Sequence, residues 1–89
     1  ALLHLSLAQA LLGAEPAQAL THAERACVLD PKFSAAWKAR GQALLALARP
    51  AEASAAWEAG MAVAHARGDV QAAREMGVFL RRLHKAAAS

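Results

Sequence analysis

Tyrosine and isoleucine are absent from the 89-residue sequence, and aromatic residues make up only 4% of it. Valine is also scarce, so the chain has few of the β-branched and aromatic residues that favour strands. Hydrophobic residues nevertheless account for 57% of the sequence, and alanine contributes heavily to that share. A core built from such small side chains requires helices that pack closely against one another. The composition therefore predicts an all-α fold in one small domain.

Cysteine occurs only once, at Cys27, which excludes a disulfide within the chain. A lone cysteine is compatible with a reducing compartment and so with a cytoplasmic location, and we expect Cys27 to be a small buried residue. No apolar run of about 18 residues free of charges and helix breakers is present, which argues against a membrane span, and no signal peptide is recognisable. Because the sequence begins with alanine rather than methionine, we interpret it as part of a longer protein.

The sequence is similar to itself after a shift of about 34 residues. This shift places Pro16 on Pro50 and Ala19 on Ala53. Each proline opens an alanine-rich segment and suits the first turn of a helix, where its missing N–H group is harmless. Each period therefore contains two helices, and we expect helices at residues 2–13, 17–29, 35–47, 51–66 and 69–86.

The connections between these helices predict two antiparallel hairpins followed by one unpaired helix. The turns before Pro16 and Pro50 are short, which forces the flanking helices to run antiparallel. Between the hairpins, Ser34 is placed to cap the following helix, and Gly68 and Asp69 provide the same signals before the last one. The last helix is interpreted as a cap that shields the apolar end of the stack.

The segment from Trp37 to Trp57 resembles the tetratricopeptide repeat (TPR) family, whose unit follows W-x2-L-G-x2-Y, then A-x3-F, then P. Trp37, Gly41 and Ala53 match this pattern, and Leu44 and Trp57 stand for the Tyr and the Phe. The resemblance explains a glycine inside a helix, because Gly41 is expected where the two helices of the hairpin cross most closely, together with Ala53.

Departures from the pattern are found in both units. Arg40 replaces the Leu of the motif, His65 replaces the closing Pro of the second unit, and Leu7 occupies the usual Gly position of the first. The resemblance implies a short α-solenoid with a degenerate first repeat at 1–33, a second repeat at 34–67 and a capping helix at 68–89.

Binding in TPR arrays takes place on the concave face, which the first helix of each unit lines. The resemblance therefore implies a mostly apolar groove for a peptide or helix of a partner protein. Its expected residues are His4, Leu5, Ala8, Leu11, Lys38, Gln42, Leu45, Ala72, Met76 and Phe79. An alternative for three of them, Leu45, Met76 and Phe79, is that they simply pack together under the final helix.

Some TPR proteins hold the C-terminal carboxylate of a chaperone with Lys and Asn side chains on this face. The corresponding positions here are His4, Ala8, Ala39, Asp69 and Ala73, none of which is the required residue. A chaperone carboxylate is therefore not the expected ligand.

Catalytic and metal-binding patterns are not recognisable. His4, His22, His65 and His84 have no helical spacing to another metal ligand, and no phosphate loop or nucleophile motif is present, so neither an enzyme nor a cofactor is expected.

Nucleic acid is a weaker alternative partner. The last helix carries Arg74, Arg81, Arg82 and Lys85 with His84 nearby, and a basic face of this kind can bind phosphates or an acidic protein. No aromatic platform lies beside it, however, and a solvated outer face explains the charges. The sequence thus leaves two main hypotheses, a protein-interaction module and a structural end-piece that closes a longer array without a ligand of its own.

Overall fold

Five α-helices make up the fold. The computed structural model describes residues 1–88, with side chains as far as Ala87. The helices are α1 (Leu2–Leu11), α2 (Pro16–Leu29), α3 (Ser34–Ala46), α4 (Pro50–Arg67) and α5 (Val70–Ala88). The described residues contain no strand, so the predicted all-α class is confirmed, and the helix ends lie within two residues of the predicted ones.

Local sequence signals account for most of the helix ends. Pro16 and Pro50 each occupy the first helical position, as predicted. After α4, Gly68 adopts a left-handed conformation with φ 73°, and its N–H donates to the carbonyl of His65 while the N–H of Asp69 donates to that of Ala64. These paired bonds satisfy carbonyls that the end of a helix leaves without partners.

The end of α3 uses the same arrangement without a glycine. Ala48 has φ 58°, the single positive φ among the described non-glycine residues. Its N–H donates to the carbonyl of Leu45, and the N–H of Arg49 donates to that of Leu44. Alanine gives no sequence signal for a left-handed conformation, which costs it roughly 1–2 kcal/mol, so this strained turn could not be predicted.

Ser34 does not cap α3, contrary to the prediction. It is the first residue of the helix, Phe33 precedes it without a side-chain capping bond, and the Ser34 hydroxyl donates instead to Oδ2 of Asp69 at 2.7 Å. Asp69 does cap its helix, because its Oδ1 accepts the N–H of Ala72 at 3.2 Å. Ser34 therefore joins the starting ends of α3 and α5 rather than closing its own helix.

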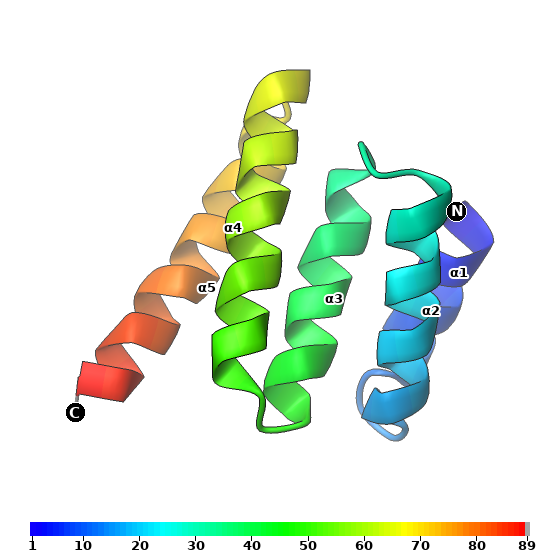
Figure 1. The fold of residues 1–89 in the computed structure, drawn as a ribbon, viewed down its shortest axis with the longest axis horizontal. Helices are drawn as coiled ribbons and strands as arrows, with labels where there is room; N and C mark the ends of the chain where they lie inside the picture. The colour runs from blue at the N-terminus through cyan, green and yellow to red at the C-terminus, as the bar shows by residue number, and fades with distance from the viewer. Residues whose placement is uncertain (89) are drawn as a thin grey trace.

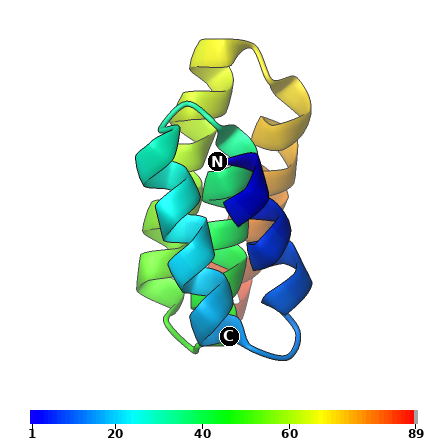
Figure 2. The ribbon, with the colours of Figure 1, turned by 90° about the vertical axis from the view of Figure 1, so that its right-hand side faces the viewer.

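The helices form a row in which each contacts mainly its neighbours along the chain (Figure 1). Seen from the end, α1 and α2 form the first layer and run antiparallel (Figure 2). The Cα atoms span 37 × 32 × 16 Å, so the row is a thin slab. This arrangement of hairpins stacked on hairpins confirms the predicted short α-solenoid with a terminal fifth helix.

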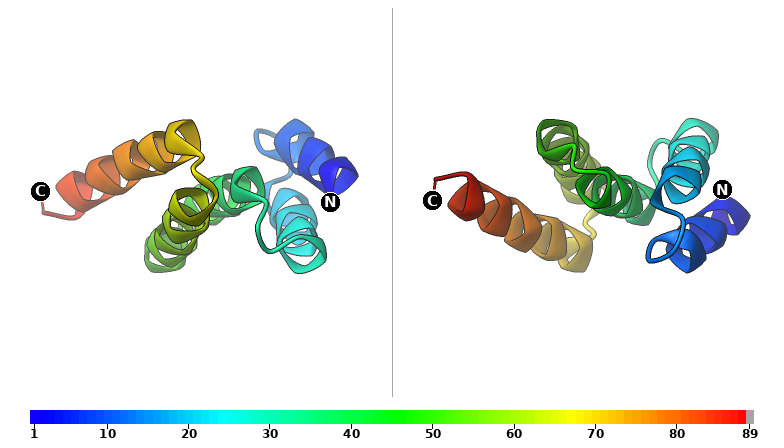
Figure 3. Two further views of the ribbon diagram at one scale, coloured as in Figure 1. Left: turned by 90° about the horizontal axis from the view of Figure 1, so that it is seen from above. Right: turned by 90° about the horizontal axis from the view of Figure 1, so that it is seen from below.

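The row is curved. Helices α1, α3 and α5 lie along one side and α2 and α4 along the other (Figure 3). On the first side α1 contacts α3 and α3 contacts α5, whereas α2 and α4 do not contact each other. The side formed by α1, α3 and α5 is consequently the inner face of the curve, and the other side is the outer face.

Two buried glycines allow the helices to approach closely at the centre of the row. A Cβ atom at Gly41 of α3 would overlap the indole of Trp57, so the predicted close crossing at Gly41 is confirmed, with Trp57 of α4 as its nearest neighbour. A Cβ atom at Gly60 of α4 would come within 2.5 Å of the sulfur of Met76 and 2.7 Å of the Cβ atom of Trp37. Gly60, which the sequence analysis did not single out, therefore brings α3, α4 and α5 together.

Candidate functional site

The first halves of α3 and α5 are joined by polar contacts on the inner face. Besides the bond from Ser34 to Asp69, the ammonium group of Lys38 lies 3.1 Å from Oε2 of Glu75. The Ser34 hydroxyl and then the N–H of Ala72 stabilise the carboxylate of Asp69 and lower its pKa. The side chain of Ser34 is almost fully buried, so this end of the helix pair is closed.

Beyond these contacts the two helices diverge toward the C-terminus of α5 (Figures 1 and 3). The space between them is an open groove of about 390 Å³. Apolar side chains supply most of its lining, with one amide and one guanidinium. The lining residues are Gln42, Leu45, Trp57, Phe79, Arg82, Leu83 and Ala86.

Trp57 and Phe79 form an aromatic pair in this groove. Their ring centroids are 5.2 Å apart and their planes are tilted by 40°, a favourable arrangement for two aromatic rings. The indole N–H of Trp57 donates to the carbonyl of Lys38 at 3.2 Å, and Trp57 is only 1% exposed. Because its one polar atom is bonded within the fold, the pair presents an apolar surface. Leu45, which is 44% exposed, provides accessible apolar area beside it.

The ten groove residues expected from the sequence fall into separate environments. Gln42, Leu45 and Phe79 are brought together, and Lys38 lies next to them in its salt bridge. Met76 is fully buried and Ala72 is 8% exposed, so both belong to the core under α5.

The α1 part of the expected stripe is mostly covered. Leu5 and Ala8 are buried against Ala23 of α2 and Ala39 of α3, and Leu11 packs in part against the central core. The accessible part of the expected stripe thus lies mainly between α3 and α5.

His4 is paired with His22 of α2. The two Nδ1 atoms are 3.0 Å apart and the rings are stacked with centroids 5.3 Å apart. A hydrogen bond between them requires one ring to donate and the other to accept, so at least one imidazole must be neutral. Desolvation by burial and then the neighbouring His22 lower the pKa of His4.

Arg82, Leu83 and Ala86 were not predicted as groove residues, and Arg82 was assigned to the outer basic face. Their spacing from Phe79 holds the missing signal, because residues three, four and seven positions further along a helix share its face. The structure places these residues beside Gln42 and Leu45.

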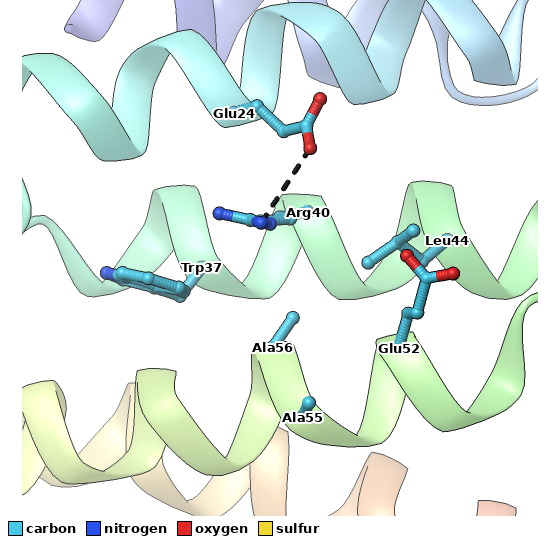
Figure 4. A pocket seen from close by; sticks show the side chains of 7 residues that line it. All are labelled: Glu24, Trp37, Arg40, Leu44, Glu52, Ala55 and Ala56. Carbon is cyan, nitrogen blue, oxygen red and sulfur yellow. Dashed lines mark ion pairs between the residues drawn. The ribbon is translucent and has the colours of Figure 1, made fainter.

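A second groove lies on the outer face, between α2 and α4 and above α3 (Figure 4). Arg40 points into it, with its guanidinium 3.7 Å from the carboxylate of Glu24 and 5.4 Å from the ring centroid of Trp37. Glu52 of α4 lines the same groove. The arginine that replaces the apolar motif residue is therefore accommodated by an ion pair and an aromatic face.

Cys27 is buried, as expected for a small core residue, and burial raises the pKa of its thiol. Among the residues whose positions are described, no three His, Cys, Asp or Glu side chains gather in a way that could hold a metal ion. None of the helices in that part of the chain is long and apolar enough to cross a membrane.

Comparison with known proteins relates the chain to one curated protein and one solved structure. No protein-family model matches it. It is 46% identical over 87 residues to a protein of Pseudomonas aeruginosa named as TPR repeat-containing, and the match covers 97% of this chain and 83% of the relative. The solution structure of a Bordetella parapertussis protein superimposes with a TM-score of 0.88 at 40% identity, covering 98% of this chain and 76% of that protein.

Proposed function

Because the chain belongs to the tetratricopeptide repeat family, we propose that it is a protein-interaction module that binds a peptide or helix of a partner protein in the groove between α3 and α5. The observation that carries the proposal is the open end of the α3–α5 pair, where Leu45 and Phe79 remain accessible. The first halves of the same helices are closed by polar contacts, so the accessible apolar surface between α3 and α5 is confined to their second halves.

The lining of the groove indicates the kind of segment that it accepts. The apolar part of the lining, formed by Leu45, Phe79 and Leu83, can accept one or two apolar side chains of a partner. Such buried apolar anchors usually provide most of the binding energy of an interface. Gln42 and Arg82 at its border can donate hydrogen bonds to backbone carbonyls or to a carboxylate of the partner. We therefore propose an apolar segment with an acidic or carbonyl group beside its anchor residue.

The remaining elements have supporting roles in this proposal. Residues 1–33 and 34–67 act as two repeats, and α5, in the capping segment that begins at residue 68, completes the groove. The module acts by binding, and its residues are not assigned any catalytic step or cofactor. Lys38 fixes the spacing of α3 and α5 through Glu75 rather than serving as the main ligand contact.

Site-specific photo-crosslinking in the parent organism tests this assignment. A benzophenone amino acid replaces Leu45 in the groove, and in a matched control it replaces Val28, which is 72% exposed on α2. We expect the probe at Leu45 to form an adduct with one defined segment of a partner protein, identified by mass spectrometry, and the probe at Val28 not to form it.

A synthetic peptide of the identified segment must then bind the isolated chain, and Leu45→Asp must weaken this binding. No adduct from Leu45, or the same adducts from both positions, would favour the structural end-piece that closes a longer array.

A further inference from the structure

A third groove lies at the outer end of the row, where α4 meets α5. Its volume is about 480 Å³, and apolar residues line most of it. Arg74 and Arg81 of α5 are among its lining residues, and neither forms a salt bridge with any side chain in the described part of the chain. The full lining is Met61, His65, Val70, Ala73, Arg74, Gly77, Val78 and Arg81.

Internal repetition shows what this groove corresponds to. Lys38 of α3 forms a salt bridge with Glu75 of α5, so these two residues lie at the same level along the two helices. The sequence separation between Lys38 and Glu75 also separates Gln42 from Phe79, and these two residues line the same inner groove. The same separation relates lining residues of the outer groove on α3 to lining residues of the groove on α5. It relates Trp37 to Arg74, Arg40 to Gly77 and Leu44 to Arg81, and these six residues line the two grooves.

The two grooves differ in one respect. The groove above α3 has a wall on each side, α2 and α4, and the second wall supplies Glu52, Ala55 and Ala56. In the part of the chain that the structure describes, residues of α4 and α5 alone line the groove above α5. The α4 side of the groove above α3 thus presents small apolar side chains and the carboxylate of Glu52, whereas Arg40 forms its ion pair with Glu24 on the α2 side, as Figure 4 shows.

We propose that the groove formed by α4 and α5 is a second docking surface, which binds an acidic amphipathic helix of a partner protein alongside Arg74 and Arg81 of α5. Small and apolar residues of that helix lie on Ala73, Gly77 and Val78, and its carboxylates lie beside Arg74 and Arg81. This surface is separate from the inner groove of the proposed function and does not depend on it.

Charge complementarity selects this occupant over a second copy of the chain. Pairing two copies symmetrically through α5 would bring Arg74 and Arg81 of one copy next to those of the other, and the chain already carries a net charge of +3. The exposed leucines of α1 offer an apolar surface for the groove, but α1 contains no acidic residue to face the two arginines. An acidic amphipathic helix can place apolar side chains on the apolar lining of the groove and carboxylates beside Arg74 and Arg81.

Two designed peptides test the proposal by NMR titration of the isotopically labelled chain. Both have the 18-residue length of α4 and the same alanine and leucine stripe, and they differ only in carrying glutamate or lysine beside it. We expect the glutamate peptide to shift the amide signals of Met61, Ala73, Gly77 and Val78, and the lysine peptide to leave them unchanged. Equal shifts with both peptides, or shifts confined to Gln42, Leu45 and Phe79, would overturn the proposal.

Two variants make the result specific. A Cβ atom at Gly77 would make only ordinary van der Waals contacts, the nearest with Met61 at 3.6 Å, so Gly77→Leu places its side chain in the groove and should weaken binding of the glutamate peptide by about tenfold or more. The double variant Arg74→Glu with Arg81→Glu should reverse the preference toward the lysine peptide. Leu45→Asp, in the inner groove, should leave the binding unchanged.

Circular dichroism confirms that each variant is folded before the titrations are compared. Undiminished binding to Gly77→Leu or an unchanged charge preference in the double variant would contradict the proposal. So would concentration-dependent self-association that covers Gly77, detected by sedimentation, because it would identify the occupant as a second copy.

Discussion

Replacing Gly41 by alanine has two effects of opposite sign on the free energy of unfolding. In an exposed helix, alanine is more favourable than glycine by about 1 kcal/mol. In this structure the added methyl group would overlap the indole of Trp57. The ring is held in place, because Trp57 is 1% exposed, packs against Phe79 and donates its N–H to the carbonyl of Lys38.

Overpacking of this kind costs about 1–3 kcal/mol, and here it also displaces a hydrogen bond worth about 1 kcal/mol. We therefore expect Gly41→Ala to lower the free energy of unfolding by about 1–3 kcal/mol, after the gain in helix propensity is subtracted. For a domain of this size each kcal/mol lowers Tm by about 4–8 °C.

Denaturant and thermal unfolding followed by far-UV circular dichroism measure the change. Gly77→Ala is the matched control, because Gly77 is a helical glycine whose added Cβ atom would make only ordinary van der Waals contacts, and the variant should gain up to about 1 kcal/mol. In the background of Trp57→Leu, Gly41→Ala should lose most of its cost, since the overlapping ring is gone. If Gly41→Ala were as stable as the parent, the close packing of α3 on α4 at this position would be refuted.

Three further substitutions or conditions have defined outcomes. Trp57→Ala empties the site between α3, α4 and α5 and should cost about 3–5 kcal/mol in denaturant unfolding, so an unchanged midpoint would remove Trp57 from the core. Ala48→Gly relieves the left-handed alanine at φ 58° and should raise stability by up to about 1 kcal/mol, whereas a lower Tm would show that this turn carries no strain. Because the pKa of His4 is lowered in the folded state, the unfolded chain binds the proton more readily, and Tm should fall as the pH drops below 6.5. His22→Leu removes the neighbouring imidazole and should make this fall shallower, while an equally steep profile in the variant would exclude the histidine pair as its cause.

Much of the fold was predictable because its signals are local. Proline at the first helical position, glycine after α4 and the scarcity of β-branched residues act within a few residues of where they occur. The role of Gly41 was also predictable, since an interior glycine in a helix has few explanations other than close packing. Ala48 and Ser34 were not, because alanine can adopt a left-handed conformation without a sequence signal and the partner of Ser34 lies in another helix.

The groove was less predictable than the fold because it depends on how α5 is rotated. The expected groove positions on α5 follow from those on α3 by the 34-residue period of the first two units. Helix α4, with 18 residues, is longer than α2, with 14, and this extension changes the offset between α3 and α5. The face of α5 on the groove therefore contains Phe79, Arg82 and Leu83, while Met76 is turned into the core. No tryptophan or motif glycine in α5 fixes its rotation from sequence alone.

The most direct test of the interaction-module account is an NMR titration of the labelled chain with the partner segment identified through Leu45. The account predicts saturable shifts at Gln42, Leu45, Phe79 and Leu83, and an affinity that Leu45→Asp lowers by about tenfold or more while Val28→Asp leaves it unchanged. Shifts confined to Arg74 and Arg81, or equal affinities for the two variants, would contradict the assignment of the inner groove as the binding site.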